Sequence, residues 1–188
     1  NYLLKQIDNY YFIHEVGLTN KSGLLTLTKH KPGNINFINF DKNELNFPEN
    51  LTSKGLLITE FKIKNKKFKF INTHFNFHKN NVLRKKYTKN CFNKLINLNL
   101  NDLTFIAGDF NMFPDELKKY TKNLFLIENE KITWDKKSKY IKYFTIKNLL
   151  KQNAKLDYLF SNKKMKFKSQ TIRNDISDHY GIFTEVEI

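Results

Sequence analysis

The chain has 188 residues, 40% hydrophobic and 15% aromatic, a composition that excludes a disordered polypeptide and predicts a single domain over residues 1–188. The formal net charge of +15 comes almost entirely from lysine and favours a polyanionic partner, nucleic acid or an anionic membrane surface, although an AT-rich genome would produce the same lysine content. The single cysteine, Cys91, excludes an intrachain disulfide and favours an intracellular location, in the cytoplasm or the nucleus.

Hydrophobic periodicity predicts mainly strands in the first half of the chain. Residues Asn1–Asp8 are an exception, because Leu3, Leu4 and Ile7 share one helical face and predict the last turns of a helix. Strands are predicted at Gly23–Lys29, Asn34–Phe40, Leu56–Ile63 and Phe68–Phe75. The last two strands flank the polar tip Lys64–Lys67 and predict a hairpin.

The second half begins with the period of an amphipathic helix at Val82–Leu98. A short buried strand, Leu103–Ala107, then leads into Gly108, and Pro114 precedes a brief helix that begins with two acidic residues. The remaining predicted strands are Tyr140–Thr145, Leu156–Phe160, Lys166–Ile172 and Gly181–Ile188. Mixed strands with few helices predict an α/β sandwich of two sheets packed face to face with helices outside.

Four short polar segments lie at the ends of these apolar runs. They are Asn72-Thr73-His74, Gly108-Asp109-Phe110-Asn111, Leu156-Asp157-Tyr158 and Ser177-Asp178-His179. Together they supply two imidazoles, three carboxylates and the Asn111 carboxamide, the groups that hydrolysis of a phosphate ester with a hard divalent metal requires. Each segment alone is also compatible with a polar turn, a surface loop or a core histidine.

Two of these segments allow a more specific expectation. Asp109 and Asn111 are two residues apart after a strand, so we expect them to project to the same side. Asp157 places a carboxylate in an apolar strand, and a buried carboxylate needs an imidazole or cationic partner. His179 is the predicted partner, and the pairing would orient its ring and raise its basicity. Asp178 and His179 should point to opposite faces unless the backbone bends there.

In this order, and with Gly23–Lys29 and Pro32 upstream, the segments resemble the endonuclease/exonuclease/phosphatase superfamily. The resemblance runs from about Ser22 to Ile188. It implies a four-layer DNase I-like α/β sandwich with two packed mixed sheets flanked by helices. It also implies a divalent-metal-dependent phosphodiesterase that hydrolyses a phosphoester bond by an activated water, with Mg²⁺ or Mn²⁺ as cofactor.

The resemblance implies a role for each matching residue. His179 is the base that activates water, and Asp157 holds it. Asp109 and Asn111 orient the nucleophile, contact the phosphate and bind metal.

Three further residues complete the implied site. His74 stabilises charge on the phosphoryl oxygens and contacts the substrate, and Asp178 is a metal ligand. Trp134 lines the rim of the site as a substrate-binding residue, or else is a core aromatic.

The beginning of the chain departs from the family. Relatives open with a strand ending in Asn and a second strand ending in a Gln-Glu pair, whose Glu is the main metal ligand. Neither is present, so the sequence predicts a domain that lacks its first strand-helix-strand unit. The only nearby acid, Glu15, has a context that does not match. If the gene begins at this point, we expect weak metal affinity and weak activity.

Two branches of the superfamily fit best. Thr133-Trp134-Asp135 and Gly181 are similar to tyrosyl-DNA phosphodiesterase 2, although that branch has Thr where Phe110 stands. Bacterial-type sphingomyelinases share the same triplet and match Ser138 and Ile141-Lys142-Tyr143, but carry Pro where Gly181 stands.

Three functions therefore remain open. The first is a nuclease or DNA-end-processing enzyme, either endo- or exo-acting, with a nucleic acid as partner. The second is a sphingomyelinase-like phospholipase C, or another phosphatase of the superfamily. Its partner would be a membrane lipid, contacted by Tyr140, Tyr143 and Phe144. The third is a truncated, catalytically weak relative that only binds a partner. The sequence leaves the oligomeric state open.

Overall fold

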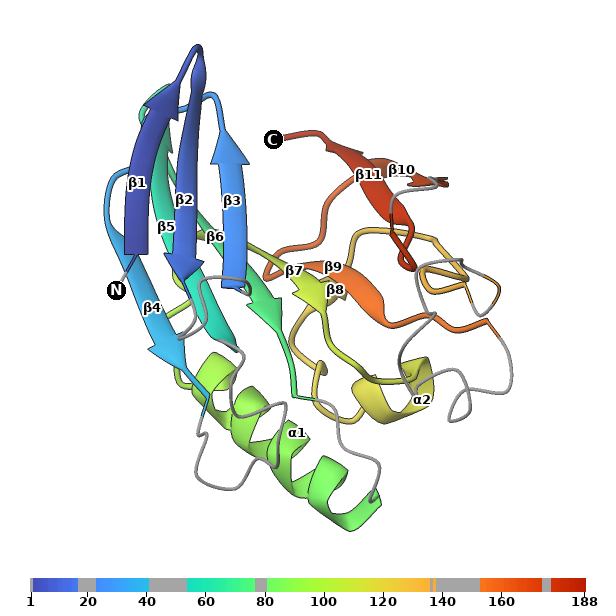
Figure 1. Ribbon diagram of the computed structural model, residues 1–188. Coiled ribbons are helices and arrows are strands. Elements are labelled where there is room, and N and C mark those ends of the chain that lie inside the picture. Colours follow the sequence, from blue (N-terminus) through green and yellow to red (C-terminus); the bar gives the residue numbers. More distant parts are fainter. Residues whose placement is uncertain are drawn as a thin grey trace. The chain divides into compact units, whose positions relative to one another are not determined.

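The computed structural model describes residues 2–16, 23–40, 54–76, 81–135, 137, 153–173 and 177–188. The chain divides into two compact units, Asn1–Gly108 (unit 1) and Asp109–Ile188 (unit 2), whose elements are labelled in Figure 1. The predicted strand Tyr140–Thr145 lies outside the described residues, as do Ser22, Ser138 and the expected lipid contacts Tyr140, Tyr143 and Phe144.

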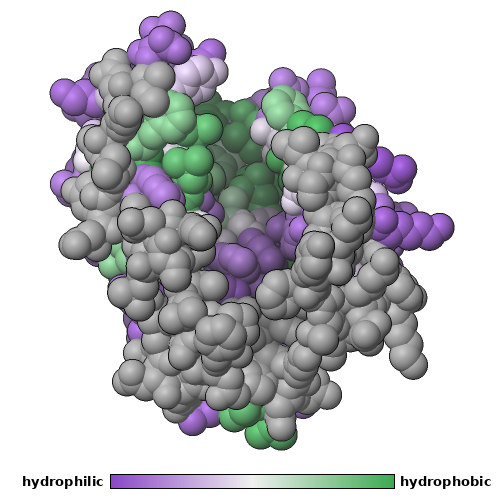
Figure 2. All heavy atoms as spheres, viewed as in Figure 1, coloured by the Kyte–Doolittle hydropathy of each residue, from purple (hydrophilic) through white to green (hydrophobic). Residues whose placement is uncertain are grey.

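Unit 1 begins with an antiparallel sheet in the order β1-β2-β3, formed by Tyr2–Ile7, Tyr10–Val16 and Gly23–Thr28. The helix predicted at Asn1–Asp8 is therefore wrong. The spacing of Leu3, Leu4 and Ile7 fits a helix. However, β2, a strand that was not predicted, is rich in aromatic and β-branched residues and pairs with this segment. Asp8, with a φ of 52°, makes the tight turn between the two strands. Figure 2 shows hydrophilic atoms at this hairpin tip, where Asp8 and Asn9 are exposed.

The second sheet of unit 1 contains β4 (Ile35–Asn39), β5 (Gly55–Ile63), β6 (Lys66–His74) and β7 (Leu103–Asp109) in that order. The predicted hairpin of β5 and β6 is confirmed. Its two-residue turn is Lys64-Asn65, with φ values of 46° and 64°. The strands expected at Gly23–Lys29, Asn34–Phe40 and Leu103–Ala107 are confirmed as β3, β4 and β7.

The two sheets of unit 1 pack face to face. Ile13 of β2, Leu24 of β3 and Leu57 of β5 form one buried cluster, with Ile35 and Phe37 of β4 packed against it. The predicted helix is α1 (Asn81–Ile96), and its Phe92 ring lies 5.0 Å from that of Phe75, just after β6. Unit 1 therefore has the layered α/β arrangement predicted from the sequence. Among the described residues, no helix has the length and hydrophobicity needed to cross a membrane.

Unit 2 contains α2 (Pro114–Leu117) and the antiparallel pairs β8–β9 and β10–β11. The strands are β8 (Phe125–Leu126), β9 (Asp157–Ser161), β10 (Phe167–Ile172) and β11 (Gly181–Val186). Only β8 was not predicted. Phe110 packs edge-on against Tyr158 and Phe160 of β9, with ring centroids 5.8 Å and 5.6 Å apart, and its backbone N–H donates to Leu156 O. These contacts hold the chain segment after Asp109 beside β9.

A buried ion pair lies next to Tyr158 of this aromatic cluster. The Lys155 ammonium donates to the Glu128 carboxylate, and their side chains are 8% and 0% exposed. Lys155 Nζ also lies 4.9 Å from the centroid of the Tyr158 ring. Burial raises the pKa of Glu128, and the hydrogen bond and charge of Lys155 oppose that rise.

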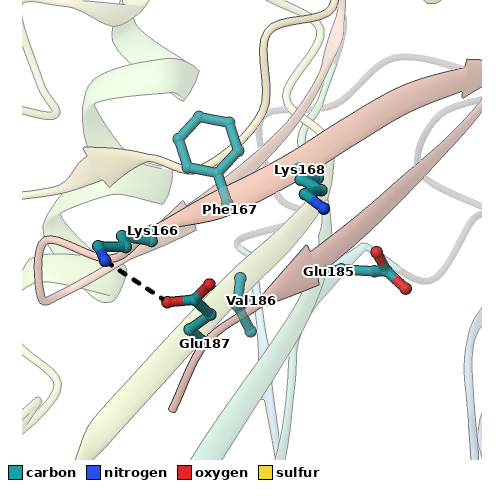
Figure 3. A pocket seen from close by; sticks show the side chains of 6 residues that line it. All are labelled: Lys166, Phe167, Lys168, Glu185, Val186 and Glu187. Atoms are coloured by element: carbon teal, nitrogen blue, oxygen red, sulfur yellow. Dashed lines mark ion pairs between the residues drawn. The ribbon is translucent and has the colours of Figure 1, made fainter.

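A pocket on the β10–β11 hairpin is separate from the predicted site residues of unit 2 (Figure 3). It is lined by Lys166, Phe167, Lys168, Glu185, Val186 and Glu187. The Lys166 and Glu187 side chains pair across it at 3.9 Å. Glu185 lies six residues beyond His179, roughly 20 Å along an extended strand, so the hollow is distant from the polar segment before β11.

Candidate active site

The first pair of the site is Asp157, at the start of β9, and His179, just before β11. The His179 Nδ1–H donates to Asp157 Oδ2 over 2.7 Å, and the two side chains are 27% and 21% exposed. The predicted pairing of this imidazole with this carboxylate is confirmed. Because Asp157 occupies Nδ1, the other ring nitrogen, Nε2, is the one that can exchange a proton with a substrate or a water.

The surroundings of His179 change its protonation. Burial lowers the pKa of His179, but the hydrogen bond and charge of Asp157 outweigh burial. The charges of Asp109 and Asp178 add to this effect and bring the pKa to about 9. The ring is therefore mainly an imidazolium at neutral pH in the metal-free chain.

Asp109 lies at the end of β7, immediately after Gly108, a position where any side chain would clash with the backbone of β6. Gly108 has a φ of 146°, and a Cβ on it would lie 1.8 Å from Thr73 O. The backbone N–H of Asn111 donates to Asp109 Oδ1 over 2.7 Å, with Asn111 at a φ of 50°. β7 ends at Asp109 and the chain turns there, so strand alternation does not place the Asn111 side chain, and the expectation that Asp109 and Asn111 project to the same side stays a prediction.

Asp109, Asp157 and His179 form a compact cluster. Each offers one ligand atom, and these atoms all lie within 4.8 Å of one another. Two carboxylates and one imidazole in such a space suit a divalent cation, and hard ions such as Mg²⁺ prefer the carboxylate oxygens. Of the metal ligands that the resemblance implies, Asp109 belongs to this cluster, and its carboxylate chemistry fits such an ion.

Asp178 lies next to His179 in the chain and contacts a different partner. Its Oδ2 accepts a hydrogen bond from Trp134 Nε1 over 3.2 Å. The backbone bends at this point, because Ser177 Oγ accepts the His179 N–H at 3.1 Å. The role of Asp178 as a metal ligand stays a prediction.

Trp134 is buried, with 1% of its surface exposed, and packs with Ala154 and Leu156. Its indole N–H reaches Asp178, and its backbone forms an antiparallel bridge with His179. The core position matches the alternative expected for this residue, and its role in substrate binding stays a prediction.

His74 belongs to unit 1, at the end of β6. Its Nε2 lies 3.2 Å from Nζ of Lys54, which is 4% exposed and also donates to Phe75 O. An ammonium group has no lone pair, so Lys54 donates and His74 Nε2 accepts.

Residues that the sequence reasoning did not assign to the site also contact it. Thr133 Oγ1 accepts the backbone N–H groups of Leu156 and Asp157 at 2.9 Å and 3.0 Å. Tyr180 donates its hydroxyl hydrogen to Asp135 Oδ2 over 2.6 Å, a bond that lowers the pKa of Asp135. The sequence signal for Thr133 and Asp135 was the Thr133-Trp134-Asp135 triplet, which resembles two branches of the superfamily.

The sequence profile of the Endonuclease/Exonuclease/phosphatase family 2 matches residues 1–180 of the chain. No curated protein sequence matched the chain.

Solved structures give a consistent comparison. An endonuclease/exonuclease/phosphatase family protein from Leptotrichia buccalis is 22% identical, with a TM-score of 0.67, over 100% of this chain and 72% of that one. A Staphylococcus aureus beta toxin mutant with bound magnesium ions is 19% identical, with a TM-score of 0.66, over 88% of this chain and 68% of that one. TDP2 from D. rerio, complexed with a single-strand DNA product, is 17% identical, with a TM-score of 0.60, over 97% and 74%. The predicted DNase I-like α/β sandwich is thereby confirmed.

Proposed function

The chain belongs to the endonuclease/exonuclease/phosphatase family 2, and from that premise we propose that it is a divalent-metal-dependent phosphodiesterase acting on nucleic acid. Members of the superfamily are hydrolases of phosphoesters. The observation that carries the proposal is the hydrogen-bonded pair of Asp157 and His179 with the Asp109 carboxylate in the same 4.8 Å cluster.

His179 is the proposed proton-transfer group. Asp157 fixes the Nδ1–H and orients the ring, which leaves Nε2 to take a proton from the attacking water. The base must be neutral to do so, while its pKa of about 9 in the metal-free chain favours the imidazolium. Asp109 orients the water, and its own orientation is fixed by the Asn111 N–H.

Asp109, Asn111 and Asp178 are the proposed metal ligands. Mg²⁺ or Mn²⁺ at this position would polarise a phosphoryl oxygen and offset the negative charge that raises the pKa of His179. In unit 1, His74 and the adjacent Lys54 ammonium are proposed to contact the phosphoryl oxygens of the substrate.

Nucleic acid is the preferred substrate because of charge. A net charge of +15 on 188 residues attracts a polyphosphate backbone. TDP2 from D. rerio, which has a related fold, was solved with a single-strand DNA product. Binding through lysines would make cleavage fall steeply as salt increases, in proportion to the number of phosphates neutralised.

A phospholipid phosphodiester is the second candidate, as in a sphingomyelinase-like phospholipase C. Two observations favour it: the fold likeness to beta toxin, and a charge that equally suits an anionic membrane surface. Both candidates use the same attack of water on a phosphodiester, so the site residues do not separate them.

The test is a parallel assay of the chain on DNA oligonucleotides and on choline-lipid vesicles, with Mg²⁺ or with a chelator. We expect DNA cleavage that requires the metal and decreases with salt. Hydrolysis of choline lipid without DNA cleavage would replace the first candidate by the second. His179→Ala is the inactive control, and Asp115→Asn, whose side chain is 96% exposed on α2, is the active one. If neither substrate is hydrolysed, the remaining candidate is a truncated, catalytically weak relative that only binds a partner.

A further inference from the structure

The segment Thr133–Asp135 lies between the two pieces of chain that carry the proposed proton-transfer pair. On one side Trp134 forms an antiparallel bridge with Ala154, three residues before Asp157. On the other side it forms an antiparallel bridge with His179 itself. The segment is therefore in register with both partners of the pair.

One set of hydrogen bonds joins the segment Thr133–Asp135 to the start of β9, which carries Asp157. Thr133 Oγ1 accepts the N–H of Asp157 at 3.0 Å and that of Leu156 at 2.9 Å. Thr133 is fully buried, with 0% of its surface exposed, so water does not replace this acceptor. Two convergent backbone donors fix where β9 begins, and with it the Asp157 side chain.

The other contacts fix the segment before β11. Trp134 Nε1 donates to Asp178 Oδ2 over 3.2 Å, and the Asp135 N–H donates to Asp178 O over 3.0 Å. The Tyr180 N–H donates to Thr133 O over 2.7 Å, and the Tyr180 hydroxyl donates to Asp135 Oδ2. His179 lies between Asp178 and Tyr180, so both of its chain neighbours are held.

We infer that Thr133 and Trp134 are positioning residues: Thr133 sets Asp157, and Trp134 sets Asp178, so that one triplet holds the carboxylates on both sides of His179. The inference rests on the proposed function, because it assigns these residues to the same reaction. Replacing a residue that orients a metal ligand or a catalytic group typically lowers activity or metal affinity by about 10-fold to 100-fold.

Thr133→Val and Thr133→Ser test the first half. Valine keeps the shape and loses the acceptor, whereas serine keeps the hydroxyl. We expect Thr133→Val to lower kcat by about 10-fold to 100-fold with little change in KM, and Thr133→Ser to recover most of it. Thr121→Val, a threonine after α2 whose hydroxyl donates to Leu117 O, is the matched control and should keep full activity.

The second half has a spectroscopic test, because Trp134 is the only tryptophan in the chain. A ¹⁵N-labelled sample gives one indole N–H signal, which we expect to be protected from exchange and to move in Asp178→Asn. Trp134→Phe keeps an aromatic ring and loses the donor, and it should weaken Mn²⁺ binding, measured by electron paramagnetic resonance, by about 10-fold.

The outcomes separate this inference from the proposed function. Wild-type kcat in Thr133→Val, together with an indole signal that does not respond to Asp178→Asn, would overturn the positioning roles. If Thr133→Val fails to fold, the comparison of Thr133→Ser with wild type and the indole signal still decide the matter. If the wild-type chain hydrolyses no phosphodiester, the proposed function fails, while the indole and Mn²⁺ measurements still report on the positioning.

Discussion

Replacing Asp157 by Asn tests the central pair most directly. Asparagine keeps the size of the side chain but removes the charge that stabilises the His179 imidazolium. The pKa of His179, about 9 against an ordinary 6.5, corresponds to about 3 kcal/mol of stabilisation of the charged ring. Asp109 and Asp178 supply part of this stabilisation, and solvent screens the rest because the His179 side chain is 27% exposed. We therefore expect Asp157→Asn to lower the free energy of unfolding by about 2 kcal/mol.

The sign of the pH dependence follows from a raised pKa. His179 contributes stability that is fully present below about pH 6.5 and is lost as the pH rises through about 9. Wild type and Asp157→Asn should therefore differ most in unfolding free energy near pH 6 and least near pH 10.

Two measurements on metal-free protein check this reasoning. Denaturant unfolding at several pH values gives the difference in stability, and an NMR titration of the His179 ring gives its pKa, expected to fall toward 6.5 in Asp157→Asn. Asp115→Asn, on the exposed surface of α2, should change neither. A His179 pKa unchanged by Asp157→Asn, or a stability difference that grows with pH, would refute the assigned pairing. With metal present, kcat should fall by about 10³-fold to 10⁴-fold.

Three further predictions concern other parts of the chain. Asp178→Ala and His179→Ala should each lower turnover by about 10²-fold to 10⁴-fold while far-UV circular dichroism stays native, and activity retained in either would contradict its role. Lys155→Met leaves the Glu128 carboxylate buried and should cost about 3 to 5 kcal/mol in denaturant unfolding; replacing Glu128 by Gln as well should recover much of it. Gly108→Ala should cost at least about 2 kcal/mol, and an unchanged melting temperature would show that the strand shifts freely.

Some features of this fold could be predicted because they are local. The β5–β6 hairpin follows from two alternating runs around a polar tip, and α1 follows from a change of hydrophobic period. The helix expected at Asn1–Asp8 shows where such reasoning fails. The same leucine spacing served a strand once β2 was available as a partner, and pairing between strands is a tertiary contact.

The sequence by itself determined that Asp157 needed a cationic or imidazole partner, with His179 as the candidate, because a carboxylate in an apolar strand is too costly without a partner. Only the tertiary structure decided how the site residues are held: the turn that brings the Asn111 N–H onto Asp109, the bend after Ser177, and the Thr133–Asp135 segment that joins β9 to the residues before β11. These depend on hydrogen bonds between residues more than twenty positions apart or on backbone angles that side-chain patterns do not encode. The convergence of His74 with this cluster stays a prediction.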